Sequence, residues 1–328
     1  MPRRRRFIVS KKTYHLTFRV RSGLPFVATA YMKLIIGGVL ARAQRDNKID
    51  LSEALFMSNH AHMIATVKDP QQLINFYQEV QKKLTDIIKK LLGIEQLNLW
   101  EGRPVIEYLP NVEDVTKKIA YLYSNPARAN LIDTVSDYPG FSTYNDFISA
   151  SNNIDATVVR KEYWLPSSRT PLLPARSMKH HQAIDFAQEL KELAIEQELE
   201  LKPNSWMKSF GISEEHEVKE IRLSIMASIA ANEAAARELR VQLKKGILGI
   251  KALRTQEIMR AHKPAKSVFK SFISTMCNET RMAFIKQYNA ICDICRECYE
   301  KAKLGLVCEW PPGIFRPTFG HVASALDW

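Results

Sequence analysis

Two closely spaced histidines are the first residues of this chain with obvious chemical potential. Residues 57–67 read MSNHAHMIATV, in which His60 and His62 are separated by one small residue. Side chains two positions apart on a β-strand point to the same side, so a strand here would present both imidazoles together. Two neutral imidazoles placed in this way can bind one divalent cation. The alternative is that both rings line the edge of a core or face solvent.

A tyrosine and an asparagine downstream form a second group. The segment 116–132, TKKIAYLYSNPARANLI, has helical spacing, and we expect this helix to end at Pro126. Tyr121 and Asn125 are four residues apart and therefore share one helical face. If that face packs beside the histidines, the Asn125 amide oxygen becomes a third metal ligand and the Tyr121 phenol enters the same site. The alternative is a buried tyrosine followed by an asparagine that ends a helix before proline.

The elements that must position these residues can be predicted from periodicity. Alternating or β-prone segments predict strands over residues 14–20, 48–56, 60–67 and 104–109, and helical spacing predicts helices over 29–45, 71–92 and 111–126. The order β-α-β-β-α-β followed by a helix is the split βαβ, or ferredoxin-like, arrangement. We therefore predict an α+β fold with an antiparallel sheet and helices on one face.

The domain organisation changes near residue 150. Residues 1–150 would form the α+β domain with a basic N-terminal arm, and residues 151–177, with three prolines in WLPSSRTPLLPAR, would form a connector. Residues 178–328 are predicted to form a mainly α-helical C-terminal domain, whose role the sequence does not indicate.

Positive charge is concentrated at the start of the chain. The net charge is +12, and residues 1–21 hold eight Lys or Arg and no acidic residue. Such an arm gains free energy on a polyphosphate by releasing counterions, which makes Arg3, Arg4, Arg5, Arg6 and Arg19 candidate DNA contacts. A solvated tail is the alternative. No apolar stretch approaches the roughly 20 residues of a membrane span and no secretory signal follows the arm, so a cytoplasmic protein without a membrane partner is expected.

The five cysteines all lie in the last part of the chain. Cys292, Cys295 and Cys298 form C-x-x-C-x-x-C, which suggests a zinc or iron-sulfur site with Cys277, Cys308 or His321 as a fourth ligand. The same spacing also places cysteines on one apolar helical face, and we favour this packing interpretation. A disulfide framework is not expected without a secretory signal.

Taken together, these motifs resemble a known family. The segments YHLTFRV, MSNHAHMIATV, LWEGRPV and YLYSNPARANLI followed by SDYPGFS are similar to those of HUH single-strand nucleases, and within them to the REP-associated tyrosine transposases. This resemblance extends over roughly residues 3 to 145, within the split βαβ arrangement predicted above. A long helical C-terminal extension also occurs in relatives of this kind.

The resemblance implies a specific chemistry. It assigns Tyr121 as the nucleophile and His60, His62 and Asn125 as ligands of a divalent metal, Mg²⁺ or Mn²⁺, with Zn²⁺ as a further option. The implied activity is cleavage and strand transfer on single-stranded or hairpin DNA through a 5′-phosphotyrosine. Tyr123 points to another side of the helix and is the poorer candidate for nucleophile.

The chain also departs from the family pattern. Ser58 stands where the family usually has proline, Ala61 is smaller than the common middle residue, and NPARANLI lacks the usual glycine. None of these changes removes a catalytic group, but they suggest a divergent member. The alternative function is a catalytically silent protein that binds DNA hairpins with the same fold. The sequence does not indicate an oligomeric state or a target DNA sequence.

Overall fold

The computed structural model describes residues 7–262 and 272–314. The chain divides into two compact units, one formed by Lys11–Thr275 and the other by Met1–Ser10 with Met276–Trp328. Each unit is described by itself. Within the described residues, no helix is both long and apolar enough to cross a membrane.

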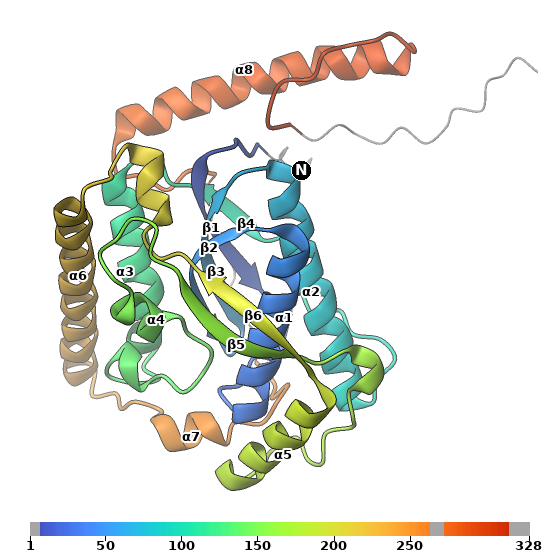
Figure 1. Cartoon of the computed structure of the whole chain (residues 1–328), viewed down its shortest axis with the longest axis vertical. Helices are drawn as coiled ribbons and strands as arrows, with labels where there is room; N and C mark the ends of the chain where they lie inside the picture. The colour runs from blue at the N-terminus through green and yellow to red at the C-terminus, as the bar shows by residue number, and fades with distance from the viewer. Residues whose placement is uncertain (1–6, 263–271, 315–328) are drawn as a thin grey trace, which may run out of the picture. The chain divides into compact units, whose positions relative to one another are not determined.

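A six-stranded sheet forms the centre of the larger unit (Figure 1). Its order is β4-β1-β3-β2-β6-β5, and the strands are β1 (Lys12–Arg19), β2 (Asp50–Met57), β3 (His60–Val67), β4 (Val105–Tyr108), β5 (Val158–Trp164) and β6 (Ile195–Leu201). The first four strands in this order pair antiparallel, as predicted, whereas β2 and β6 pair parallel at Leu51 and Leu201. The α+β class and the predicted β-α-β-β-α-β order are confirmed, and the sheet as a whole is mixed.

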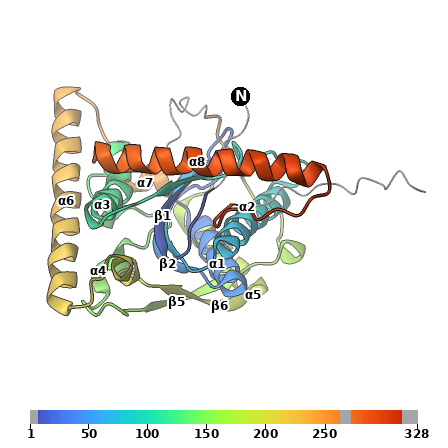
Figure 2. The ribbon, with the colours of Figure 1, turned by 90° about the horizontal axis from the view of Figure 1, so that it is seen from above.

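Helices cover both faces of this sheet (Figures 1 and 2). The two crossover helices, α1 (Ala30–Asn47) and α2 (Pro70–Leu92), pack against each other on one face. The opposite face carries α3 (Val112–Arg128), and α6 (Glu215–Gln242) packs behind it. The prediction that the helices share one face is therefore correct for α1 and α2 and wrong for α3. The reason is that β2 and β3 have apolar side chains, such as Leu55 and Ile64, on the second face as well, and α3 buries them.

The helix α3 continues past Pro126 to Arg128, so the predicted end at Pro126 is wrong. Proline lacks an N–H and forfeits one bond to the preceding turn, but its fixed φ is close to the helical value. Near the end of a helix this costs little, and the amide of Ala129 still donates to the Asn125 carbonyl at 2.9 Å. The last helical turn, which contains Asn125, is therefore intact.

Two strands lie where the sequence predicted a connector and helices. β5 falls within residues 151–177 and β6 within residues 178–328, and they form an antiparallel pair that extends the sheet beyond β2. β6 reads IEQELEL, in which Leu199 and Leu201 are buried and their neighbours are acidic. This is the alternation of a half-buried strand.

A pair of glycines in α1 lets β5 approach the helix closely. A Cβ atom on Gly38 would lie 2.0 Å from the carbonyl oxygen of Tyr163, and one on Gly37 would lie 2.0 Å from a carboxylate oxygen of Glu162. A helix with larger residues at these positions could not pack here without moving the strand. The glycine pair Gly37-Gly38 inside the predicted helix is therefore explained by packing against β5.

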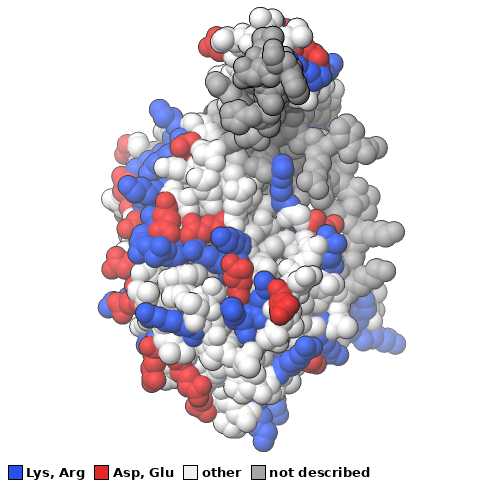
Figure 3. All heavy atoms as spheres, turned by 90° about the vertical axis from the view of Figure 1, so that its right-hand side faces the viewer, with Lys and Arg blue, Asp and Glu red and all other residues white. Residues whose placement is uncertain are grey.

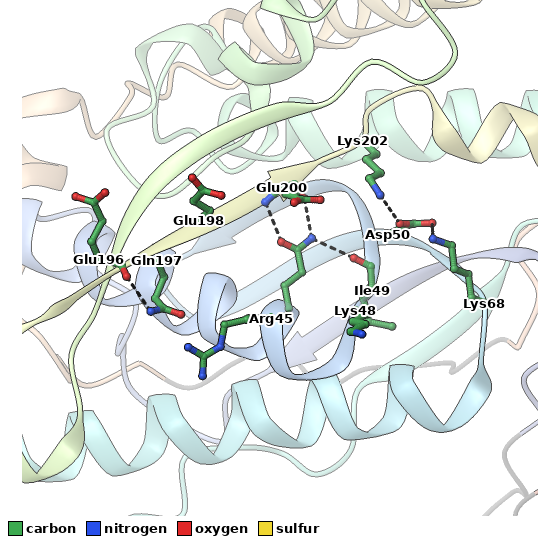
Figure 4. A pocket seen from close by; sticks show the side chains of 11 residues that line it. Arg45, Lys48, Ile49, Asp50, Lys68, Glu196, Gln197, Glu198, Glu200 and Lys202 are labelled. Carbon is green, nitrogen blue, oxygen red and sulfur yellow. Dashed lines mark hydrogen bonds and ion pairs between the residues drawn. The ribbon is translucent and has the colours of Figure 1, made fainter.

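The hollow at the junction of β2 and β6 is bridged by side chains (Figure 4). The Gln44 amide nitrogen donates to the Glu200 carbonyl at 2.6 Å, and its oxygen accepts from the Glu200 amide at 2.8 Å. Asp50 accepts from Lys202 at 3.0 Å and from Lys68 at 2.8 Å. The Gln44 side chain thus provides hydrogen-bond partners for the backbone N–H and C=O of Glu200 in β6, at a position where β2 does not pair with β6.

The other elements of the larger unit are short helices. They are α4 (Tyr144–Ser149), α5 (His180–Leu193) and α7 (Ile250–Arg254), with 3₁₀ turns η1 (Val135–Asp137), η2 (Ser167–Arg169) and η3 (Ser205–Phe210). β5 and β6 extend the sheet, and α6 packs on α3. Residues 151–275 therefore belong to the same compact unit as the rest of the sheet. The compact units therefore divide near residue 275 and not at the predicted boundaries near 150 and 178.

The smaller unit is built on α8 (Asn278–Lys303). The Phe7 ring lies 6.1 Å from the Phe284 ring and 6.4 Å from the Tyr288 ring, and the Ile8 amide donates to the Gly313 carbonyl at 3.1 Å. Two of the three cysteines in C-x-x-C-x-x-C, Cys295 and Cys298, are buried, whereas Cys292 is half-buried. These positions agree with the packing interpretation of the motif.

Candidate active site

Strand β3 presents His60 and His62 on the same face of the sheet. Their ring centroids lie 5.0 Å apart with the planes nearly perpendicular, at 86°. The register of β1 places Thr17 opposite His62 and Arg19 opposite His60, so all four side chains share this face. The structure thus places the two imidazoles together, as the H-x-H spacing predicted.

Helix α3 brings Tyr121 to the histidines. The Tyr121 ring meets the His62 ring edge to face, with centroids 5.6 Å apart and planes at 82°. Asn125 lies one turn further along the helix, where it is buried, and its amide nitrogen has no hydrogen-bond partner among the described residues. The tyrosine helix therefore lies on the histidine side of the sheet, which is the arrangement that the predicted site requires.

Two cations flank the Tyr121 ring. The Arg128 guanidinium carbon lies 4.9 Å from the ring centre and the Lys118 ammonium 5.7 Å from it. Arg128 is exposed, whereas Lys118 also contacts the Glu107 carboxylate at 3.2 Å. Positive charge at this distance attracts an anionic group such as a phosphate. The tyrosine therefore lies in a positive environment.

Tyr123 is held in a different place. It is fully buried, its hydroxyl donates to an oxygen of the Glu53 carboxyl group, and it lies 2.9 Å from the Thr143 hydroxyl. Burial and the adjacent Glu53 raise the pKa of Tyr123 well above its usual range. A buried, hydrogen-bonded phenol cannot reach a DNA backbone, so of these two tyrosines Tyr121 is the one that lies beside the histidines and is accessible.

Both candidate ligand histidines are neutral at neutral pH. Burial lowers the pKa of His60 to about 4, with further contributions from the charges of Arg19 and His262. Burial also holds the pKa of His62 well below its usual range, assisted by the neighbouring His15 and His60. A metal requires unprotonated imidazole nitrogen, so these rings need not lose a proton before binding.

Two residues of this cluster were not predicted from the sequence. His15 on β1 lies with its Nε2 3.0 Å from His62 Nδ1, and its Nδ1 lies 2.8 Å from a Glu107 oxygen on β4. Burial lowers the pKa of His15 below its usual value despite that bond. The alternation of YHLTFRV did place His15 on the polar face, but its contact with His62 depends on strand pairing between distant segments.

The residues present fit a divalent metal of the kind expected. His62 Nε2 is buried and has no hydrogen-bond partner within the described residues, so its lone pair is open to a cation. Within residues 7–262 and 272–314, no group of three or more His, Cys, Asp or Glu side chains is arranged to hold a metal. The predicted ligands would offer a cation the imidazole nitrogens of His60 and His62 and the amide oxygen of Asn125, a donor set that suits Mg²⁺ or Mn²⁺ and, through the imidazoles, Zn²⁺.

Comparison with known proteins gives one curated relative. Over 142 residues the chain is 23% identical to the REP-associated tyrosine transposase of Escherichia coli K12, covering 43% of this chain and 81% of the relative. The chain is similar to this transposase. This relative confirms the resemblance that the motifs indicated.

A solved structure is also similar, and no family model matches the chain. It is a REP-associated tyrosine transposase bound to a REP hairpin, which is 22% identical and aligns with a TM-score of 0.40 over 45% of this chain and 86% of that one.

The departures from the transposase pattern have structural counterparts here. Ala61 is fully buried and points away from His60 and His62, because alternate residues of a strand face opposite sides. Asn130 adopts the left-handed conformation, with φ of 56°, which asparagine tolerates better than most residues other than glycine. A glycine in NPARANLI is therefore not needed for the chain to turn after α3.

Ser58 connects the histidine strand to the C-terminal extension. Its hydroxyl donates to Gln256 at 2.7 Å, and the neighbouring Asn59 amide nitrogen lies 2.9 Å from His262 Nε2. The Asn59 oxygen in turn accepts from His60 Nδ1 at 2.6 Å. Where the family usually has proline, this chain therefore has a contact with its own extension.

The predicted DNA-contacting arginines are only partly described. Arg3, Arg4, Arg5 and Arg6 lie outside the described residues, and Arg19 is half-buried on the histidine face. On the face drawn in Figure 3, Lys and Arg alternate with Asp and Glu, as is usual for a solvated surface. The basic groups nearest the candidate nucleophile are instead Lys118 and Arg128.

Proposed function

We propose that this chain is a metal-dependent endonuclease and strand transferase for single-stranded or hairpin DNA, with Tyr121 as its nucleophile. The observation that carries the proposal is the contact between the Tyr121 and His62 rings, 5.6 Å apart, beside an unpartnered buried imidazole nitrogen. The similarity to a REP-associated tyrosine transposase supports the same activity. Neither a packed core nor a simple binding surface requires this combination.

Each residue has a distinct part in the proposed reaction. His60, His62 and Asn125 would hold Mg²⁺ or Mn²⁺, which supplies charge neutralisation at the scissile phosphate when it is bound. The Tyr121 oxygen attacks phosphorus and forms a 5′-phosphotyrosine, while the bond from phosphorus to the 3′ oxygen breaks and leaves a 3′-hydroxyl. The phenolic proton is released and the leaving 3′ oxygen takes up a proton. Because one phosphate ester bond replaces another, the bond energy is retained for rejoining the strands.

Lys118 and Arg128 assist this reaction electrostatically. The two cations beside the Tyr121 ring stabilise the extra negative charge that the phosphate acquires during attack. Arg128, which is exposed, is the one free to contact the DNA backbone.

A covalent trapping experiment tests the proposal. Full-length protein is incubated with Mn²⁺ and a labelled DNA library that combines hairpins with randomised single-stranded flanks, since the target sequence is unknown. Protein-DNA adducts that survive denaturation are then counted and sequenced. We expect adducts with wild type, none with Tyr121→Phe, and near wild-type amounts with Tyr144→Phe, which removes a partly buried tyrosine hydroxyl elsewhere on the same side of the fold.

The alternative function is a DNA-hairpin-binding protein without catalytic activity. The basic environment of Tyr121 would serve such a protein equally well, so binding alone does not distinguish the two. Hairpin binding without adducts, for wild type and Tyr121→Phe alike and with Mg²⁺, Mn²⁺ or Zn²⁺ present, would establish the alternative and refute the nuclease.

A further inference from the structure

We propose that His15 and Glu107 form a hydrogen-bond relay that sets the tautomer of His62 and so keeps its Nε2 lone pair available for the metal. The inference rests on the proposed function in one respect, namely that His62 is a metal ligand. It assigns positioning roles to two residues that neither touch DNA nor bind the cation. Both belong to strands that flank the histidine strand on one side, β1 and β4.

The direction of the relay follows from its outer end. A carboxylate has no proton to donate at neutral pH, so Glu107 must accept from His15 Nδ1, which lies 2.8 Å away. A neutral imidazole has one N–H, so His15 Nε2 is then an acceptor. Because His15 Nε2 lies 3.0 Å from His62 Nδ1, the proton between them must belong to His62.

The geometry of the rings agrees with this assignment. The His15 and His62 rings are nearly parallel, with planes 15° apart and centroids 5.1 Å apart, and their facing nitrogens lie within hydrogen-bond distance at 3.0 Å. The Thr17 hydroxyl, 3.3 Å from the same His62 Nδ1, can accept from it but is the more distant partner. With its single proton on Nδ1, His62 presents a bare Nε2, the atom that is buried without a partner among the described residues.

A charged His15 would reverse the outcome. It would donate from both nitrogens, so His62 would have to accept at Nδ1 and carry its proton on Nε2, where it would block the metal. Two features oppose that state. His15 is only 2% exposed, so a charge on its ring would be buried. The negative charge of Glu107 is already balanced by the Lys118 ammonium 3.2 Å away.

The second histidine has its own, independent support. His60 Nδ1 donates to the Asn59 side-chain oxygen at 2.6 Å, which also leaves Nε2 bare. Groups that orient metal-bound histidines in this way typically contribute about 10- to 100-fold in metal affinity. Because the two histidines use different partners, His60 serves as an internal control for changes made at His15 or Glu107.

Nitrogen NMR of the metal-free full-length protein tests the tautomer directly. Labelling the eight histidines with ¹⁵N and comparing spectra with His62→Gln identifies the His62 signals. We expect wild-type His62 to be protonated at Nδ1 and bare at Nε2. In His15→Phe we expect a substantial shift of the His62 population towards the Nε2–H tautomer, while His60 is unchanged.

Variants at Glu107 separate the relay from a general loss of structure. Glu107→Gln keeps an oxygen that can accept from His15, so we expect His62 tautomer and Mn²⁺ affinity within about twofold of wild type. Glu107→Met removes the acceptor, and we expect Mn²⁺ affinity, measured by electron paramagnetic resonance titration, to fall about 10-fold. Glu113→Met, which breaks only the exposed pair with Lys117, is the matched control and should have no effect.

The outcomes distinguish the relay from the proposed function. A wild-type His62 protonated at Nε2, or a tautomer that does not respond to either His15→Phe or Glu107→Met, would overturn the relay. If wild type has the expected tautomer but binds neither Mn²⁺ nor Zn²⁺, the metal-dependent function fails and the relay stands as a hydrogen-bond arrangement without a metal. The affinity loss in Glu107→Met together with its rescue in Glu107→Gln supports both.

Discussion

Replacing Tyr121 or Tyr123 of α3 by phenylalanine should separate a loss of DNA cleavage from a loss of folding stability. Tyr123→Phe removes the hydroxyl that donates to Glu53 and contacts Thr143 at 2.9 Å inside the core. A buried polar group left without its partner costs about 1–3 kcal/mol. Because the Thr143 hydroxyl lies 3.4 Å from the same Glu53 oxygen and can replace part of the lost bond, we expect about 2 kcal/mol.

The loss should appear in thermal unfolding. With an unfolding entropy of about 2.1 cal/mol/K per residue, a change of 1 kcal/mol moves the midpoint of a chain of this length by about 1.5 °C, so Tyr123→Phe should unfold about 3 °C below wild type. Adduct formation measured well below that temperature should remain. Tyr121→Phe should show the opposite pattern, with an unchanged midpoint and no adduct, because this half-buried hydroxyl contributes little to the core.

Tyr144→Phe provides the baseline for removing a hydroxyl from the same aromatic cluster, since its ring packs 5.2 Å from that of Tyr123. A change of less than about 0.5 kcal/mol is expected there. Loss of adducts in a folded Tyr123→Phe, together with adducts retained in Tyr121→Phe, would show that the nucleophile has been assigned to the wrong tyrosine.

Three further perturbations test the surrounding architecture. Gly38→Ala should destabilise the protein by about 1–3 kcal/mol in urea unfolding, because its Cβ would lie 2.0 Å from the Tyr163 carbonyl oxygen; an unchanged midpoint would contradict the close packing of β5 on α1. Burial raises the pKa of Glu53 well above 4.5. Above pH 4.5 the folded state therefore holds a proton that the unfolded state has lost. As a result, Glu53 lowers the free energy of unfolding by up to about 1.4 kcal/mol per pH unit as the pH rises towards its folded pKa. Glu53→Gln should abolish that contribution in unfolding curves between pH 5 and 8, and an identical slope in both proteins would refute it. Arg240→Met should cost about 2 kcal/mol, because buried Arg240 donates to the Ala127 carbonyl at 2.9 Å near the end of α3; a loss below 0.5 kcal/mol by calorimetry would contradict this anchoring role.

The split βαβ core could be predicted from the sequence because its signals are local. Alternation over residues 14–20 and 60–67 and helical spacing over 71–92 correspond to β1, β3 and α2 almost residue for residue. The two strands β5 and β6 were missed for a physical reason. A short alternation such as IEQELEL is rich in glutamate, a good helix former, and only pairing with a partner strand distant in the chain makes it a strand.

The candidate site was predictable to a similar extent. His60 and His62, and likewise Tyr121 and Asn125, each lie within one element, so their shared faces follow from spacing alone. His15 and Glu107 belong to other strands, and their contact with His62 depends on the registers Thr17↔His62 and His15↔Glu107. Register is set by the whole sheet, which is why these two residues became visible only in the structure.

The packing of α6 behind α3 sets a limit on how this protein can be divided. The apolar face of the tyrosine helix, including Ile119 and Leu122, is buried in a cluster that contains Ile225 and Ile229 of α6. A fragment that stops near residue 150, where the family resemblance ends, would expose this face to water and remove the packing that supports the helix of Tyr121. Helix α6 of the extension thus completes the hydrophobic core behind α3. A minimal version of this protein would have to retain residues far beyond the ones that resemble a transposase.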